Sequence, residues 1–153
     1  DEFYKPREFF SLDGLQVACG TMGMPTATVR LCGPDGEMHL QACVGTGPVD
    51  AAFKAVDAII QAGSTLQEFS VHAVTEGIDA LGEVTVRIQG SNGQTKIDAQ
   101  KDIDYHRTYG GHGADTDIIV ASVKAYLSAL NKLLAAKGVE DFLPEEQAVL
   151  AAG

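Results

Sequence analysis

The sequence predicts an α+β protein built from two βββα units related by a pseudo-twofold axis, with each helix packed on a small antiparallel sheet. Three observations support this fold class. Runs that alternate apolar and polar residues predict strands, each half of the chain contains one amphipathic helical run, and the two halves repeat the same order of elements. Because one three-stranded sheet with one helix leaves apolar surface uncovered, we expect the two units to pack on each other.

The first unit covers residues 11–63 and begins with three strands. Alternation around Val17 predicts the first strand, and residues 26–31 alternate again in the second. The turn sequence Gly33-Pro34-Asp35-Gly36 then predicts a hairpin that leads into a third strand at 38–44.

The helix of the first unit follows the tripeptide Gly45-Thr46-Gly47. Pro48 suits the first helical position, where its missing N–H has no intrahelical partner to lose. Asp50 falls in the first turn, where the helix dipole favours a negative charge. Apolar residues then recur at helical spacing, and Gly63 is predicted to cap the C-terminal end of the helix.

The second unit covers residues 64–137 and repeats this order. A strand around Val71 resembles the first strand, and residues 83–88 match residues 26–31 almost position by position. A hairpin turn at 90–93 and a long polar strand from about 95 to 108 are expected next.

The second helix is expected after the tripeptide Gly111-His112-Gly113, as the first helix follows its own Gly-x-Gly sequence. Two segments lie outside the repeated units. Residues 1–10 are interpreted as a linker from an upstream part, docked in part by Phe9 and Phe10. Residues 138–153 are interpreted as a C-terminal tail with a short helix at 145–150.

Composition excludes several classes of protein. The net charge of −10 is the opposite of what a phosphate backbone needs, so no nucleic-acid partner is expected. No apolar run approaches the roughly 18 residues of a membrane span, so no membrane partner is expected. The 153 residues cannot hold a (β/α)₈ barrel of about 250 residues. The 3 cysteines favour free thiols in a reducing compartment, with a Cys19–Cys32 bridge as the alternative.

The two Gly-x-Gly sequences are candidate ligand-binding turns. The free N–H groups at a helix start attract anions, but tight turns need glycine for steric reasons as well, so both interpretations remain open. Neither turn is followed by Lys-Ser/Thr, which excludes a Walker phosphate loop. The third glycine of a dinucleotide fingerprint is also missing. A small carboxylate ligand therefore fits better than a nucleotide.

The histidines and carboxylates predict neither a metal site nor a catalytic site. None of the 4 histidines has the spacing of a zinc or iron site. Asp115 and Asp117 do not match a calcium-binding loop and are expected to cap the second helix instead. The same two carboxylates remain the basis of a minor alternative, in which the chain is a small independent enzyme.

Three long motifs carry a resemblance to a known family. They are GTGPVDAAFKAVD from Gly45, HAVTEGIDALG from His72 and GADTDIIVAS from Gly113. Together they resemble the C-terminal regulatory domain of the 2-isopropylmalate synthases, and the similarity covers about residues 12–134. One departure is Phe69, which stands where a Tyr is often found in that family.

The resemblance implies a function. The parent enzymes condense acetyl-CoA with 2-oxoisovalerate in leucine biosynthesis, on a separate barrel with a divalent metal, and this chain itself has no cofactor. The resemblance also implies that this domain forms a homodimer and binds leucine at the interface as a feedback inhibitor. The location that it implies is the bacterial cytoplasm or the plastid stroma. The effector-binding residues that it implies are Gly45, Thr46, Gly47, Pro48, Val49, Leu66, Phe69, Ala73, Gly113, Ala114 and Asp115.

Two other interpretations stay open beside this one. An isoleucine-sensing domain of the related citramalate synthases would share the fold, and the two ligands differ only in the branching of one side chain. A ligand-free dimerisation module would explain the repeated units without any effector site.

Overall fold

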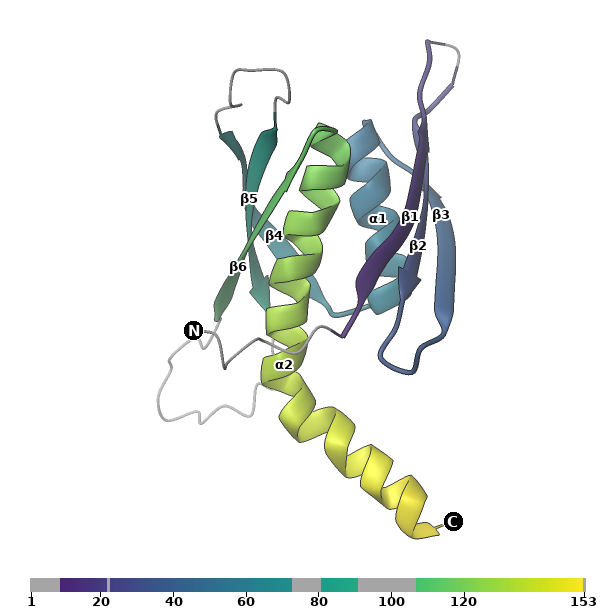
Figure 1. Ribbon diagram of the computed structural model, residues 1–153, viewed down its shortest axis with the longest axis vertical. Helices are drawn as coiled ribbons and strands as arrows, with labels where there is room; N and C mark the ends of the chain where they lie inside the picture. The colour runs from purple at the N-terminus through teal and green to yellow at the C-terminus, as the bar shows by residue number, and fades with distance from the viewer. Residues whose placement is uncertain (1–8, 22, 73–80, 91–106, 153) are drawn as a thin grey trace.

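The computed structural model describes residues 9–21, 23–72, 81–90 and 107–152. Within them the order is βββαβββα, which confirms the predicted fold class (Figure 1). The elements are β1 (Ser11–Ala18), β2 (Thr26–Cys32), β3 (Met38–Val44), α1 (Pro48–Ile60), β4 (Ser64–His72), β5 (Gly82–Gly90), β6 (Thr108–Asp115) and α2 (Ile118–Ala152).

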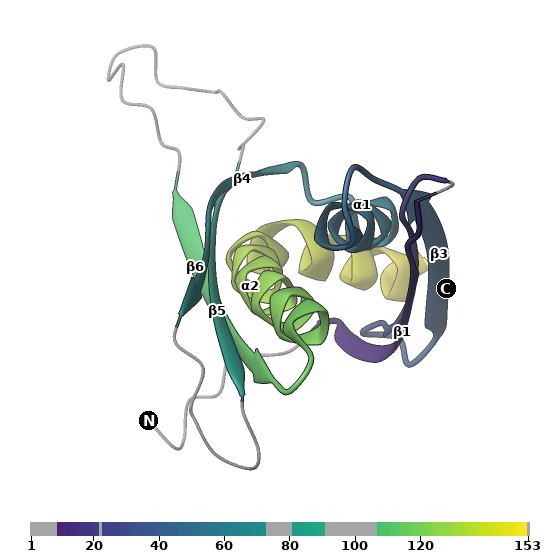
Figure 2. The ribbon, with the colours of Figure 1, turned by 90° about the horizontal axis from the view of Figure 1, so that it is seen from above.

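The strands form two antiparallel sheets, with the orders β1-β2-β3 and β4-β5-β6. Both helices lie between the two sheets, so the core is enclosed by a sheet on each side (Figure 2). The central strands contribute alternate buried side chains to this core: Ala27, Val29, Leu31, Val84, Val86 and Ile88.

The pairing register shows the duplication in detail. The edge strand β1 has an irregularity between Leu12 and Gly14, and the equivalent strand β4 has one between Leu66 and Glu68. In both sheets the residue before the irregularity pairs with the last buried apolar side chain of the central strand, Leu31 or Ile88. A shared bulge at the same point indicates that the second unit repeats the geometry of the first, and not only its polarity pattern.

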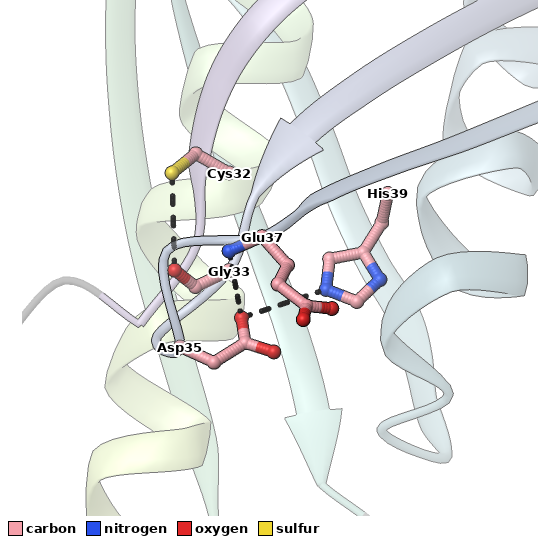
Figure 3. A network of polar contacts seen from close by, with 5 residues as sticks. All are labelled: Cys32, Gly33, Asp35, Glu37 and His39. Carbon is pink, nitrogen blue, oxygen red and sulfur yellow. Dashed lines mark hydrogen bonds and ion pairs between the residues drawn. The ribbon is translucent and has the colours of Figure 1, made fainter.

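The predicted hairpin between β2 and β3 is confirmed (Figure 3). The N–H of Gly36 donates to the carbonyl of Gly33 at 3.0 Å, and Gly36 has a φ of 82°, which glycine adopts without strain. The Asp35 carboxylate accepts a hydrogen bond from the N–H of Glu37 at 3.0 Å and lies 3.8 Å from the His39 ring. The turn is therefore closed by backbone and side chain together.

The end of α1 differs from the prediction. Gln61 caps the helix in the left-handed conformation with a φ of 51°, and its N–H donates to the carbonyl of Asp57 at 2.8 Å. Gly63 lies beyond this cap, with a φ of 71° at the approach to β4. The predicted glycine therefore shapes the connection, whereas a non-glycine residue ends the helix.

The expected turn at Gly111-His112-Gly113 is wrong, because all three residues lie inside β6. A Cβ on Gly113 would overlap the carbonyl of Ala121 and lie 2.6 Å from the N of Ala125. A Cβ on Gly111 would likewise collide with the backbone of α2. These glycines serve close packing of a strand against a helix, and the true turn before α2 comes later, at residues 116–117.

The second helix is also longer than expected. It continues without a break through Gly138 and Pro144 to Ala152, so the residues set apart as a tail with a short helix form the end of α2. Neither residue forbids helical backbone angles, although glycine lowers helix propensity and proline removes one hydrogen bond. Figure 1 shows this end of α2 extending past the two sheets.

One stretch of α2, Ile118–Ala136, is long and apolar enough to cross a membrane by length and composition alone. Most of it is buried between the sheets, as in the core helix of many water-soluble proteins. The stretch therefore carries no argument for a membrane span.

Candidate functional site

The start of α1 has no side-chain cap, and the first N–H groups of a helix have no partner within the helix. Gly47 is the N-cap, has no side-chain cap, and accepts the first helical hydrogen bond from the N–H of Ala51 at 2.9 Å. Asp50 turns its carboxylate back to the N–H of Thr46 at 2.9 Å and pairs with Lys54 at 3.2 Å. The hydrogen bond from Thr46 and the Lys54 charge hold the pKa of Asp50 below its usual range.

The two glycines of this turn have different roles. Gly45 is buried, and a Cβ there would lie 2.7 Å from the Cα of Ala51 and 2.7 Å from the carboxylate of Asp50. Gly47 is extended, with a φ of −153°, and a Cβ there would meet nothing within 4 Å. Gly45 is therefore needed for the close approach of strand to helix, whereas Gly47 leaves open space beside the helix start.

A row of apolar side chains on β4 lies uncovered near α1. Leu66, Phe69 and Val71 pair with the buried Ile88, Val86 and Val84, which places them on the sheet face that looks toward the helices. Their side chains nevertheless remain 42%, 38% and 50% exposed. Among the described residues, β4 lies too far from either helix for close backbone packing.

Aromatic rings connect this row to both helices. Phe53 of α1 packs edge-to-face on Phe69, with ring centroids 6.0 Å apart, and stacks on Tyr126 of α2 at 4.2 Å. The Tyr126 hydroxyl donates to the carboxylate of Asp57 at 2.5 Å. Val49 lies four residues before Phe53, so it occupies the same face of α1 as Phe53.

Burial shifts both members of the polar pair between the helices. It raises the pKa of Asp57, although the hydrogen bond from Tyr126 opposes the shift. Burial, together with the Asp57 carboxylate, raises the pKa of the Tyr126 phenol as well. At neutral pH the tyrosine therefore remains a hydrogen-bond donor, which holds α1 to α2 beside the aromatic rings.

The start of α2 satisfies its own donors. The carboxylate of Asp117 accepts a hydrogen bond from the N–H of Ile119 at 2.8 Å, and Asp115 accepts from the N–H of Asp117 at 3.1 Å. Asp115 also lies 3.5 Å from Lys124. The predicted capping role is confirmed for Asp117, whereas Asp115, at the end of β6, binds the N–H of Asp117 and no N–H of the helix itself.

The predicted effector residues fall into three places. Gly45, Thr46, Gly47, Pro48 and Val49 form the start of α1, and Leu66 and Phe69 belong to the uncovered row on β4. Gly113 and Ala114 lie on β6, with Asp115 at its end, and Ala73 falls outside the described residues. Both helix starts lie at the same end of the molecule (Figure 1). The register places the end of β4 there too, because His72 pairs with Glu83 and Asp115 with Gly82.

Sequence reasoning did not select Phe53, Asp57 or Tyr126. Phe53 and Asp57 lie inside the first long motif, but helical spacing assigned Phe53 to the general apolar stripe. Nothing in the sequence indicated that Tyr126 reaches Asp57, because that pair joins helices from different units.

The described residues contain no group of three or more His, Cys, Asp or Glu side chains arranged to hold a metal ion. Cys19, Cys32 and Cys43 are free thiols, so the alternative Cys19–Cys32 bridge is not formed. The site consists of a bare helix start, an apolar row and an aromatic contact between helices. These features suit binding of a small amphiphilic molecule better than covalent chemistry.

Comparison with known families gives this arrangement a context. Residues 1–134 match the family described as the LeuA allosteric (dimerisation) domain. The chain belongs to this family. The resemblance carried by the three sequence motifs is therefore confirmed, and the match covers both sheets, α1 and the first part of α2 up to residue 134.

Named relatives agree with this membership. The chain is 46% identical to 2-isopropylmalate synthase B of Solanum pennellii over 98% of its length, and 48% identical to the Arabidopsis thaliana protein named 2-isopropylmalate synthase 2, chloroplastic, over 90%. It is 51% identical to the 2-isopropylmalate synthase of Gloeobacter violaceus over 87%. The chain spans about a quarter of the length of these relatives, at 22–25% of each.

Proposed function

We propose that this LeuA allosteric (dimerisation) domain binds leucine and confers feedback inhibition on a 2-isopropylmalate synthase, which condenses acetyl-CoA with 2-oxoisovalerate. The observation that carries the proposal is the uncovered apolar row on β4, which Phe69 joins through Phe53 to α1, a helix whose start has no side-chain cap. One part offers apolar surface for an isobutyl group, and the other offers N–H donors for a carboxylate.

The proposal assigns roles to individual residues. The N–H groups near Gly47 and Val49 receive the leucine carboxylate, and Leu66 and Phe69 contact its side chain. The 42% and 38% exposure of these two side chains supports this assignment, because surface facing the core normally becomes covered. A second copy of the chain covers the ligand, which makes the leucine-bound form a homodimer. This assembly agrees with the dimerisation named in the family description.

The parent enzyme supplies the chemistry in this proposal. Its catalytic barrel lies outside these 153 residues and carries the divalent metal, while this chain takes no catalytic part. We place the parent enzyme in a bacterial cytoplasm or in the plastid stroma, because relatives come from bacteria such as Gloeobacter violaceus and one plant relative is called chloroplastic.

Calorimetric titration of the chain with leucine, isoleucine and valine tests the proposal. We expect saturable binding of leucine at a lower concentration than either analogue, because a shape fitted to one branching pattern discriminates by about 1–3 kcal/mol. Tighter binding of isoleucine would assign the domain to the citramalate synthase type. Absence of binding by all three would leave a ligand-free dimerisation module, and sedimentation of the same samples reports the oligomeric state.

A further inference from the structure

A buried asparagine on α2 holds the N-terminal segment of the chain. Asn131 is only 6% exposed, and its amide oxygen accepts hydrogen bonds from the N–H groups of Phe9 at 3.0 Å and Phe10 at 2.9 Å. Its amide nitrogen donates to the carbonyl of Phe10 at 2.9 Å. A buried amide that makes three such bonds fixes backbone position strongly, because a broken bond leaves a polar group unsatisfied.

The same segment also touches the first unit. The ring of Phe10 packs edge-to-face on His39 of β3, with centroids 6.0 Å apart. Phe10 is therefore held between the helix of the second unit and a strand of the first. A relative movement of α2 and the first sheet changes the surroundings of this one residue.

A continuous set of contacts leads from the β4 row to this point. Phe69 contacts Phe53, and Phe53 stacks on Tyr126, which lies in the same buried run of α2 as Asn131. The hydrogen bond from Tyr126 to Asp57 ties the two helices together at the stack. A ligand that packs against Phe69 thus acts on the Phe53 ring, and a rigid helix connects that ring to Asn131.

We propose that α2 transmits effector binding from the β4 row to the N-terminal segment, with Phe53 as the receiving contact and Asn131 as the positioning residue that holds Phe9 and Phe10. This inference rests on the proposed leucine-binding function. It assigns a regulatory role to residues that need not touch the ligand. The physical requirement is that ligand and segment both bias the position of one element, α2.

Hydrogen exchange of the 153-residue chain, measured at the Phe9 and Phe10 amides with and without saturating leucine, tests the proposal. In the wild-type chain we expect leucine to slow this exchange several-fold, because a more firmly placed α2 opens the Asn131 bonds less often. In Phe53→Leu, which keeps apolar volume but removes the ring stack, the exchange without leucine stays near wild type and the slowing by leucine is lost.

Two further variants distinguish the effect of the Asn131 hydrogen bonds to Phe9 and Phe10 from a general loss of stability. Asn131→Ala exposes both amides to fast exchange with or without leucine. The control Lys132→Ala removes a neighbouring hydrogen bond of α2, from its ammonium to the carbonyl of Gly110 at 2.7 Å, and leaves the leucine response intact. Calorimetry on each folded variant confirms that leucine is bound during the exchange measurement.

Three outcomes would overturn the inference. Leucine binding with no change at Phe9 and Phe10 in the wild-type chain contradicts it, even if Asn131→Ala fails to fold. An undiminished leucine response in Phe53→Leu contradicts the route through the ring stack. If calorimetry detects no leucine binding to the wild-type chain, the proposed function itself fails, and this inference fails with it.

Discussion

The two βββα units have the same architecture, but they differ in how the helix start is capped and in how closely the edge strand packs on the helices. In the second unit the start of α2 is capped by Asp117, while in the first unit the equivalent N-cap is Gly47, which has no side chain. The edge strands differ in the same sense, because β1 packs closely against both helices and β4 does not.

This difference shows how a duplication can produce a single site. The second unit satisfies its own helix donors, and α2 packs so closely that β6 needs Gly111 and Gly113. The first unit leaves its helix start at Gly47 without a side-chain cap, and the same helix contacts the exposed face of β4 through Phe53. The second unit therefore stabilises the fold through its capped and closely packed helix, whereas the equivalent helix start of the first unit is available to a ligand.

The largest effect is expected from a substitution that disrupts the close packing of β6 on α2 in the second unit. Gly113→Val should destabilise the chain by about 3 kcal/mol or more, because its Cβ would collide with the backbone of α2. The control is Cys43→Val, at the equivalent position of β3, which should cost less than about 1.5 kcal/mol. Urea unfolding followed by circular dichroism measures both, and equal losses would show that the two units pack alike.

The second prediction concerns a substitution that gives the start of α1 the same kind of side-chain cap as the start of α2. Gly47→Asp should abolish leucine binding in calorimetry, because the new carboxylate takes the N–H donors as Asp117 does. No steric cost is expected, since a Cβ at this position meets nothing within 4 Å, so thermal stability should stay the same or rise.

Gly47→Ala provides the matched control for this substitution. It adds the Cβ without the carboxylate and should retain most of the affinity for leucine. Undiminished leucine binding by Gly47→Asp would exclude the start of α1 as the carboxylate site.

The smallest effect concerns the capped start of α2. Asp117→Ala should lower stability by about 1 kcal/mol, because the N–H of Ile119 loses its acceptor. Asp117→Asn keeps an acceptor oxygen and should lose less. Chemical denaturation compares the two, and leucine affinity should be unchanged in both. A large loss of affinity would mean that the second helix start also takes part in effector binding.

Much of the fold followed from local patterns. Alternation in β2 and β5 and helical spacing in α1 were sufficient because each reflects contact with the core along one element. The turn at Gly111-His112-Gly113 was misplaced because a glycine required by a neighbouring helix looks, in sequence, like a glycine required by a turn. The end of α1 was misassigned for a related reason, since Gln61 adopts the left-handed angles usually left to glycine.

The site was predictable in part. The motifs selected the start of α1, and the family resemblance implied Leu66 and Phe69 of β4, but neither indicated their connection to Phe53, Asp57 and Tyr126. That connection joins residues from both units, and no periodicity within one element reports a contact between elements.

By itself the sequence determined the repeated units, their order of elements and the family to which the chain belongs. These depend on polarity patterns and motifs, which are local along the chain. The tertiary structure alone decided which glycines serve packing, which helix start remains bare, and that Asn131 holds Phe9 and Phe10. Those features depend on the distance between elements far apart in sequence, which is set when two helices pack between two sheets.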